Sequence, residues 1–286
     1  MASAAQHTIV EATDIVDIGD LDPDKVHIPA IYVDAVVKTE ISVAEIELAG
    51  QAVARDPLKT GGASEVQGIP RDLMALRVAQ EIADLNVVNL GVGIPTLVGR
   101  WLRKLDAPVK LHAENGLLGY VGREDVEGWN WNWYDAGSLP VDLIPSTSTF
   151  DSVASFTMAR GGHLDAVVLG AYEVSENGDL ANWKIPGAKV GGIGGAMDLI
   201  AGGSSVIVVM QHTTKQGDSR LLRKCTLPLT GLGCVTTIVT NLSVIDIKPE
   251  GFVLRELAPG VSVGEVVEAT AADLLVPSHV PAMSLD

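Results

Sequence analysis

A carboxylate stands at the end of an apolar stretch of the type that forms a buried strand. Residues 109–114 end in Glu114, and Asn115 and Gly116 follow it, which are residue types of a tight turn. The end of a strand faces the ligand crevice in a typical α/β sheet. Glu114 could therefore serve as a base, a nucleophile or a metal ligand, or it could simply begin an ordinary turn.

A glycine-containing segment follows another strand-like stretch. Residues 89–95 begin with Asn89 and contain Gly91 and Gly93. The dinucleotide-binding fingerprint requires a third glycine, where this chain has Thr96, so that match fails. The segment could still be a tight turn that exposes backbone N–H groups to a ligand, or a plain connection between a strand and a helix.

A second glycine-rich segment lies at residues 187–199, with four glycines between positions 191 and 195. Glycine lets the backbone approach a ligand closely, and backbone N–H groups can stabilise an oxyanion that develops during a reaction. Gly194 and Gly195 are the candidate donors. A merely flexible loop is the alternative interpretation.

Other catalytic signatures are not found in the sequence. The six histidines form no HExxH pair, and there is neither a GxSxG elbow nor a GxxxxGK[ST] phosphate loop. Two cysteines, Cys225 and Cys234, are too few for a four-cysteine zinc site and are typical of free thiols in a reducing compartment. We therefore expect no metal site and no permanently bound cofactor.

The composition excludes several classes of partner. The formal net charge of −16 would repel nucleic acids and anionic membranes, so we expect neither as a partner. The first 20 residues lack the pattern of a signal peptide, and the longest apolar runs have strand length. We expect a cytoplasmic protein, or one of the mitochondrial matrix if it is eukaryotic.

Strand-like and helix-like stretches alternate from residue 70 onward. We expect strands at 87–90, 109–114, 165–170, 206–212, 236–247 and 252–257, and helices at 70–85, 96–104, 151–160 and 262–271. This alternation predicts an α/β fold with an open, mostly parallel sheet and helices on both faces. Before it, residues 7–18 read as one or two strands, and the Gly-rich polar stretch 41–68 reads as a linker.

Several segments together resemble family I coenzyme A transferases, specifically the B subunit of their 3-oxoacid (succinyl-CoA:3-ketoacid) group. The family signature around its nucleophilic glutamate matches Leu111–Gly119, apart from Ala113, where the family has Ser. Further matches lie at residues 89–97, 158–171, 178–187, 191–199 and 224–235. The family often has Asn-Ala-Gly-Lys where this chain has Asp135-Ala-Gly-Ser138, and the tryptophans at 129, 131 and 133 are atypical.

The resemblance implies a domain organisation and a partner. Residues 1–40 resemble the C-terminal tail of an A subunit, residues 41–68 would be a linker, and residues 69–286 would be a B-subunit domain with the fold shared by these transferases and the NagB/RpiA-like proteins. An A subunit, or the A half of a fused protein, is then the expected partner in a hetero-oligomer.

The resemblance also implies the chemistry. Glu114 would be the nucleophile of a ping-pong transfer of CoA from an acyl-CoA to a 3-oxoacid, through a glutamyl-CoA thioester, with coenzyme A as a substrate. Asn89, Gly91, Gly93, Gly194 and Gly195 would bind the thioester or its oxyanion. Glu176 lies in a literal Ser-Glu-Asn-Gly but is followed by Asp179 and Leu180, so we interpret it as a surface turn. A CoA thioester hydrolase and a non-catalytic ligand-binding domain remain alternatives.

Overall fold

The computed structural model describes residues 2–40, 67–123, 130, 133–187 and 192–286. It divides the chain into two units, Met1–Arg55 and Asp56–Asp286. Most of the expected linker, two of the three tryptophans and Gly191 lie outside the described residues.

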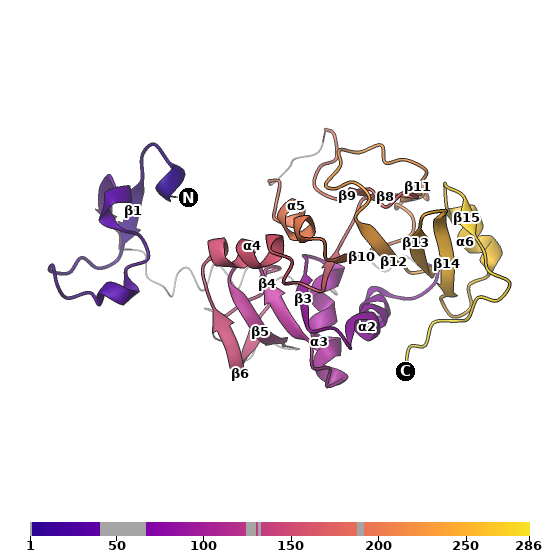
Figure 1. The fold of residues 1–286 in the computed structure, drawn as a ribbon, viewed down its shortest axis with the longest axis horizontal. Helices are drawn as coiled ribbons and strands as arrows, with labels where there is room; N and C mark the ends of the chain where they lie inside the picture. Colours follow the sequence, from indigo (N-terminus) through magenta and orange to yellow (C-terminus); the bar gives the residue numbers. More distant parts are fainter. Residues whose placement is uncertain (1, 41–66, 124–129, 131–132, 188–191) are drawn as a thin grey trace. The chain divides into compact units, whose positions relative to one another are not determined.

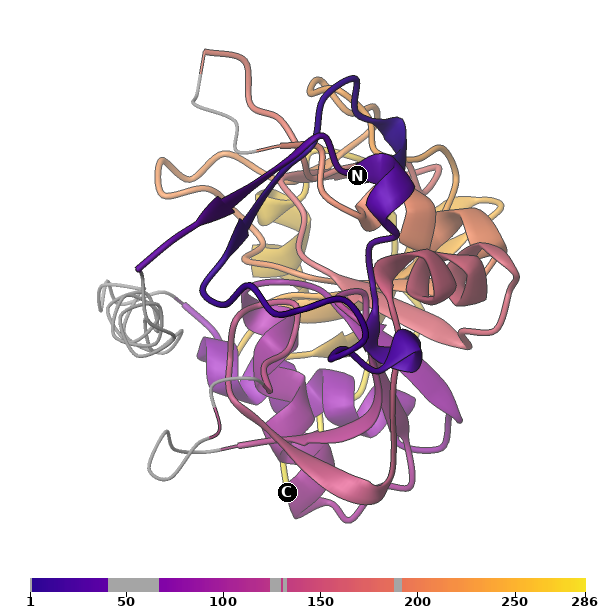
Figure 2. The same cartoon turned by 90° about the vertical axis from the view of Figure 1, so that its left-hand side faces the viewer.

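The N-terminal unit contains a small parallel sheet. Strand β1 (Ile9–Ala12) pairs with β2 (Ala35–Lys38), so that Ile9 lies opposite Ala35 (Figures 1 and 2). Only the first part of the expected strand region 7–18 forms a strand, and its partner belongs to the same unit. Three short 3-10 helices complete the described part: η1 (Ala2–Ala4), η2 (Pro23–Lys25) and η3 (Ala30–Tyr32).

The second unit is built on a ten-stranded sheet of order β15-β14-β13-β12-β10-β7-β3-β4-β5-β6. Its strands are β3 (Val87–Leu90), β4 (Lys110–Ala113), β5 (Leu117–Gly122), β6 (Val141–Thr149), β7 (Ala166–Leu169), β10 (Ser205–Val209), β12 (Val235–Val239), β13 (Ser243–Lys248), β14 (Gly251–Leu257) and β15 (Leu274–Leu275). The five central strands, β12-β10-β7-β3-β4, are parallel, and antiparallel pairs extend the sheet on both sides. The expected α/β fold with a mostly parallel sheet is confirmed.

Helices cover both faces of this sheet. On one side lie α2 (Arg71–Ile82) and α3 (Val98–Lys104), which contact each other; α3 is preceded by η4 (Ile94–Leu97). On the other side α4 (Ser152–Arg160) packs beside α5 (Ala196–Leu199) and η5 (Ile200–Gly202) (Figures 1 and 2). Helix α6 (Val263–Ala269) lies near β15 at the far end of the sheet, and a small sheet of order β11-β8-β9 joins Leu221–Leu222, Glu173–Ser175 and Leu180–Ala181.

The direction in which the chain crosses the sheet reverses between β3 and β7. From β3 the chain passes through α3 to β4 on one side, whereas from β7 it passes through α5 to β10 on the other. Right-handed crossovers in opposite directions place their helices on opposite faces, as observed. In an open α/β sheet, ligands bind beyond the carboxyl ends of the strands at such a reversal. The topology therefore favours the ends of β3, β7 and β4 as the position of the expected site.

The core is the buried layer between sheet and helices. Every residue of β7 is buried, and Met74 and Val78 of α2 have no exposed surface. The apolar positions of α2 follow the helical spacing expected from the sequence, although the helix ends at Ile82 instead of reaching Leu85. Helix α4 begins one residue after the expected start, and the side chain of its N-cap, Asp151, accepts a hydrogen bond from the Ala154 N–H at 2.8 Å.

The expected strand 236–247 is wrong as a single element. It forms two strands, β12 and β13, which pair antiparallel around a turn. The turn is closed by Thr240, whose N–H donates to the Ser243 carbonyl at 2.8 Å and whose hydroxyl accepts from the Ser243 N–H. Such side-chain bonding stabilises turns inside apolar sequences.

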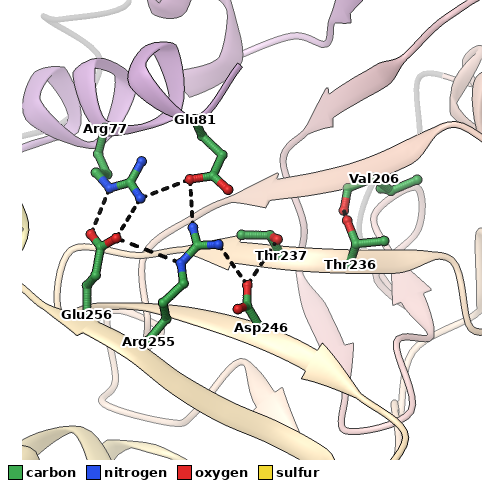
Figure 3. A network of polar contacts seen from close by, with 8 residues as sticks. All are labelled: Arg77, Glu81, Val206, Thr236, Thr237, Asp246, Arg255 and Glu256. Carbon is green, nitrogen blue, oxygen red and sulfur yellow. Dashed lines mark hydrogen bonds and ion pairs between the residues drawn. The ribbon is translucent and has the colours of Figure 1, made fainter. Parts of the chain in front are cut away.

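A network of charges fastens α2 to the antiparallel arm of the sheet (Figure 3). Arg77 of α2 makes a bidentate salt bridge with Glu256 of β14, at 2.8 and 2.7 Å. It also forms an ion pair with Glu81 at 2.9 Å. Arg255 bridges Glu81 and Asp246 at 2.7 and 3.0 Å. Burial by itself would raise the pKa of Glu256, but the hydrogen bonds and charge of Arg77, together with Arg255, lower it below its usual range.

None of the helices among the described residues is both long and apolar enough to cross a membrane.

Candidate active site

Glu114 directly follows β4 and is half-buried. The turn after it depends on Gly116, which has a φ of 114°. A Cβ at that position would lie 2.0 Å from the carbonyl oxygen of Phe150. Only glycine fits, so the Asn-Gly pair forces the chain to turn immediately after the carboxylate. The expected position of Glu114 at a strand end is therefore what the structure has.

The Asn89 side chain lies against Glu114. Asn89 belongs to β3, next to β4 in the sheet, and is fully buried. Its Nδ2 lies 3.4 Å from Oε2 of Glu114, 3.1 Å from the carbonyl oxygen of His112 and 3.0 Å from Nδ1 of the His112 ring. The amide thus donates toward the carboxylate, as a group that orients a nucleophile would.

His112 completes this layer and was not among the sequence candidates, because an isolated histidine is usually structural. It precedes Glu114 by two residues, so the two side chains leave the strand on the same face. Its Nε2 lies 3.0 Å from Oγ of Ser155 in α4, and its ring stacks near Phe150. Burial lowers the pKa of His112 to about 4, so the ring is neutral near pH 7. The i, i+2 spacing to Glu114 was the signal that could have identified it.

The glycine-rich segment reaches Glu114 from the other side. A Cβ added to Gly195 would lie 3.0 Å from Cζ of Phe156 and 3.9 Å from Cγ of Glu114. Gly194 has a φ of 68° and open space where a Cβ would be. Gly195 therefore lies beside the Glu114 side chain, and Gly194 precedes it in the chain.

The other two glycine candidates have different surroundings. The N–H of Gly91 donates to the Val168 carbonyl at 2.8 Å, which joins the end of β3 to β7. Gly93 has a φ of 97°, and its carbonyl accepts from the Thr96 hydroxyl at 2.7 Å. The N–H of Gly91 is thus already engaged within the sheet, while Gly93 forms the turn that leads into η4.

A second carboxyl lies near Glu114. Asp135 is almost fully buried, and its Oδ1 accepts from the N–H groups of Gly137 and Leu139 at 2.8 and 2.9 Å. Burial is the largest cause that raises the pKa of Asp135, the two backbone hydrogen bonds oppose it and the charge of Glu114 adds to it, so that the pKa is about 6. The nearby Tyr120 hydroxyl is buried without a hydrogen-bond partner among the described residues, and burial, Asp135 and Glu114 all raise its pKa.

Glu176 lies elsewhere. It follows β8 in the turn toward β9 of the small sheet, where its N–H donates to the Leu222 carbonyl at 3.0 Å. Its neighbours are residues of the β8–β9 turn and Gly251, not Asn89 or Gly195. Within the described part of the chain, no group of three or more acidic, histidine or cysteine side chains could hold a metal ion.

Comparison with known proteins identifies the family. The model of the coenzyme A transferase family matches residues 1–39 and 71–269, and the chain belongs to that family. These two segments lie on either side of the expected linker, residues 41–68.

The relatives fall into two lengths. The mitochondrial succinyl-CoA:3-ketoacid coenzyme A transferase 2B of Mus musculus is 38% identical over 99% of this chain, but the chain spans only 54% of that relative. The probable B subunit of the succinyl-CoA:3-ketoacid coenzyme A transferase of Bacillus subtilis is 45% identical over 73% of this chain and 97% of its own length. Among solved structures, the acyl-CoA transferase YdiF of Escherichia coli O157:H7 has a TM-score of 0.71 at 22% identity, and covers 98% of this chain and 55% of its own.

Proposed function

We propose that this chain carries the nucleophilic half of a coenzyme A transferase and that Glu114 is its nucleophile. The observation that carries the proposal is the position of Glu114: a half-buried carboxylate at the end of β4, with the Asn89 amide at 3.4 Å and Gly195 against its side chain. The family membership, the reversal in the sheet and the closeness of the glycine segment all support the same site.

The first half-reaction loads CoA onto the enzyme. A Glu114 carboxylate oxygen attacks the thioester carbonyl of an acyl-CoA, the C–S bond breaks, and a mixed anhydride and CoA thiolate are formed. The thiolate then attacks the glutamyl carbonyl and displaces the donor as a free carboxylate. The product is a thioester between Glu114 and CoA.

The second half-reaction reverses these steps with another acid. The acceptor carboxylate attacks the Glu114 thioester and releases CoA thiolate, which then attacks the acceptor carbonyl of the new anhydride. The new acyl-CoA leaves and the Glu114 carboxylate is restored. The donor and the product are both acyl-CoA thioesters of similar free energy, so a carboxylate nucleophile suffices.

Each addition generates an oxyanion beside Glu114. We assign its stabilisation to the backbone N–H groups at Gly194 and Gly195 and to the Asn89 amide, which already points toward the carboxylate. Gly91 and Gly93 would shape the turn over which the thioester lies. Binding of the remote part of CoA would help to drive the unfavourable anhydride step.

The acids proposed follow the names of the relatives. The mouse and Bacillus subtilis relatives are named for succinyl-CoA and a 3-ketoacid, so we propose that pair for this chain. A thioester hydrolase on the same scaffold would form the same glutamyl thioester but discharge it to water. Turnover that requires an acceptor acid distinguishes the transferase from the hydrolase.

Residues 1–40 support an A-half partner. Ile9, Val36 and Val37 of the two-stranded sheet are each about half exposed or more, and Ile31 is 86% exposed. A two-stranded sheet is marginally stable by itself, and exposed strand edges pair readily with another sheet. We propose that this segment packs against the A half of a CoA transferase.

Two glutamate substitutions test the proposal. With the A-half polypeptide present, Glu114→Ala should abolish CoA transfer, because no carboxylate remains to form the anhydride. Glu176→Ala is the matched control, since it removes the same group from the other Glu-Asn-Gly sequence and should leave near-normal rates. CoA transfer by the Glu114→Ala variant would refute the assignment. Loss of CoA transfer in Glu176→Ala but not in Glu114→Ala would refute it as well.

A further inference from the structure

The orientation of the Asn89 amide is unusual for a buried side chain. Its nitrogen lies within 3.4 Å of three acceptors, yet its buried Oδ1 has no partner among the described residues. Buried amides normally satisfy both ends. Here rotation of the amide would bring Oδ1 against the His112 carbonyl and the Glu114 carboxylate, so acceptors on one side decide the orientation.

Besides Glu114, the side chain that contacts the Asn89 amide is that of His112. The Ser155 hydroxyl lies 3.5 Å from the Ala113 carbonyl oxygen, to which it can donate, and 3.0 Å from Nε2 of His112, from which it can then accept. The proton of the neutral ring is then on Nε2, and Nδ1 is an acceptor for the Asn89 amide at 3.0 Å. The chain of contacts runs from α4 through β4 and β3 to the carboxylate.

We infer that His112 is a positioning residue for Glu114: its unprotonated Nδ1 holds the Asn89 amide in the orientation that donates to the Glu114 carboxylate. The inference rests on the proposed function of Glu114. In this role, Ser155 selects the His112 tautomer that carries its proton on Nε2. Asn89 then orients the Glu114 carboxylate in addition to stabilising an oxyanion.

Two substitutions of different shape separate this role from simple packing. In asparagine, Oδ1 is two bonds from Cβ, as Nδ1 is in histidine, so His112→Asn keeps an acceptor for Asn89. His112→Leu fills similar space without an acceptor. We expect kcat of His112→Leu to fall on the order of 10- to 100-fold with KM changed by less than about threefold, because a misdirected nucleophile slows chemistry more than binding. His112→Asn should recover most of that loss, and Ser155→Ala should give an intermediate rate.

His212 provides the control. It is equally buried, burial lowers its pKa to about 4 as well, and it bridges the hydroxyls of Thr240 and Thr270 at 3.0 Å each, away from Glu114. His212→Leu should lower thermal stability but leave kcat of the folded protein unchanged. These rates are measured with the A-half polypeptide present.

A second measurement needs no turnover. ¹⁵N spectra of the histidine rings in the wild-type chain, with the His112 signal identified by its loss in His112→Asn, should show the proton on Nε2. A proton on Nδ1, or a His112→Leu protein with wild-type kcat, would overturn the inference. If wild-type protein formed no thioester on Glu114, the proposed function would fail instead, whatever the tautomer.

Discussion

At the scale of single residues, the site brings two carboxyls into one largely buried region. Asp135 accepts hydrogen bonds from two backbone N–H groups, yet burial, together with the charge of Glu114, raises its pKa to about 6. The folded protein therefore binds a proton at Asp135 more tightly than the unfolded chain does. The stability that this proton contributes is complete below the unfolded pKa of about 4 and is lost as the pH rises toward 6.

The raised pKa of Asp135 predicts how Asp135→Asn changes stability. Asparagine offers the same Oδ1 acceptor to Gly137 and Leu139 without the buried charge, so the variant should be more stable than wild type at pH 7 by on the order of 3 kcal/mol. The difference should shrink as the pH falls to about 4. Urea unfolding at several pH values measures it, and a variant that is less stable at pH 7 would contradict the burial argument.

At the scale of elements, the contact between α4 and the segment before α5 brings the backbone to the carboxylate. Phe156 of α4 lies 3.0 Å from where a Cβ on Gly195 would be, a spacing that real side chains rarely adopt. Gly195→Ala should therefore push this segment away from Glu114 and lower kcat, while the chain still folds.

The paired variant makes this prediction specific. Phe156→Leu shortens the ring that obstructs the new Cβ, so the double variant Gly195→Ala, Phe156→Leu should recover part of the lost rate, as steady-state kinetics would show. If Gly195→Ala turned over at the wild-type rate, the glycine segment would be only a connection.

The elements differ in how well the sequence predicts them. Helices α4 and α6 begin within one residue of their expected starts, because their N-caps, Asp151 and Ser262, are local signals, and Ser262 forms a complete capping box. Strand β6 was not predicted: it is mostly exposed, contains Pro145 and lies at the sheet edge, so it lacks an apolar pattern. Likewise Glu114 and Gly195 follow from local motifs, whereas the roles of Ser155 and Asp135 depend on how α4 and a distant turn pack against β4.

At the scale of the whole molecule, the N-terminal segment carries exposed apolar side chains that a functional enzyme would cover. We expect the chain by itself to show no CoA transfer and the addition of an A-half polypeptide to restore it, because the exposed apolar side chains of residues 1–40 would pack against that partner. The assay is transfer between succinyl-CoA and a 3-oxoacid, with and without the added polypeptide. Full activity of the chain alone would contradict the proposed partner.

The proposed mechanism requires Glu114 to form a covalent thioester with CoA. The direct measurement is the intact mass of the protein, with its A-half polypeptide, after incubation with succinyl-CoA and no acceptor acid, followed by peptide mapping. We predict a mass increase equal to CoA with loss of water, located on the peptide that contains Glu114, absent in Glu114→Ala and discharged when a 3-oxoacid is added. An unmodified protein that nevertheless transfers CoA, or a modification on the peptide of Glu176, would contradict the account.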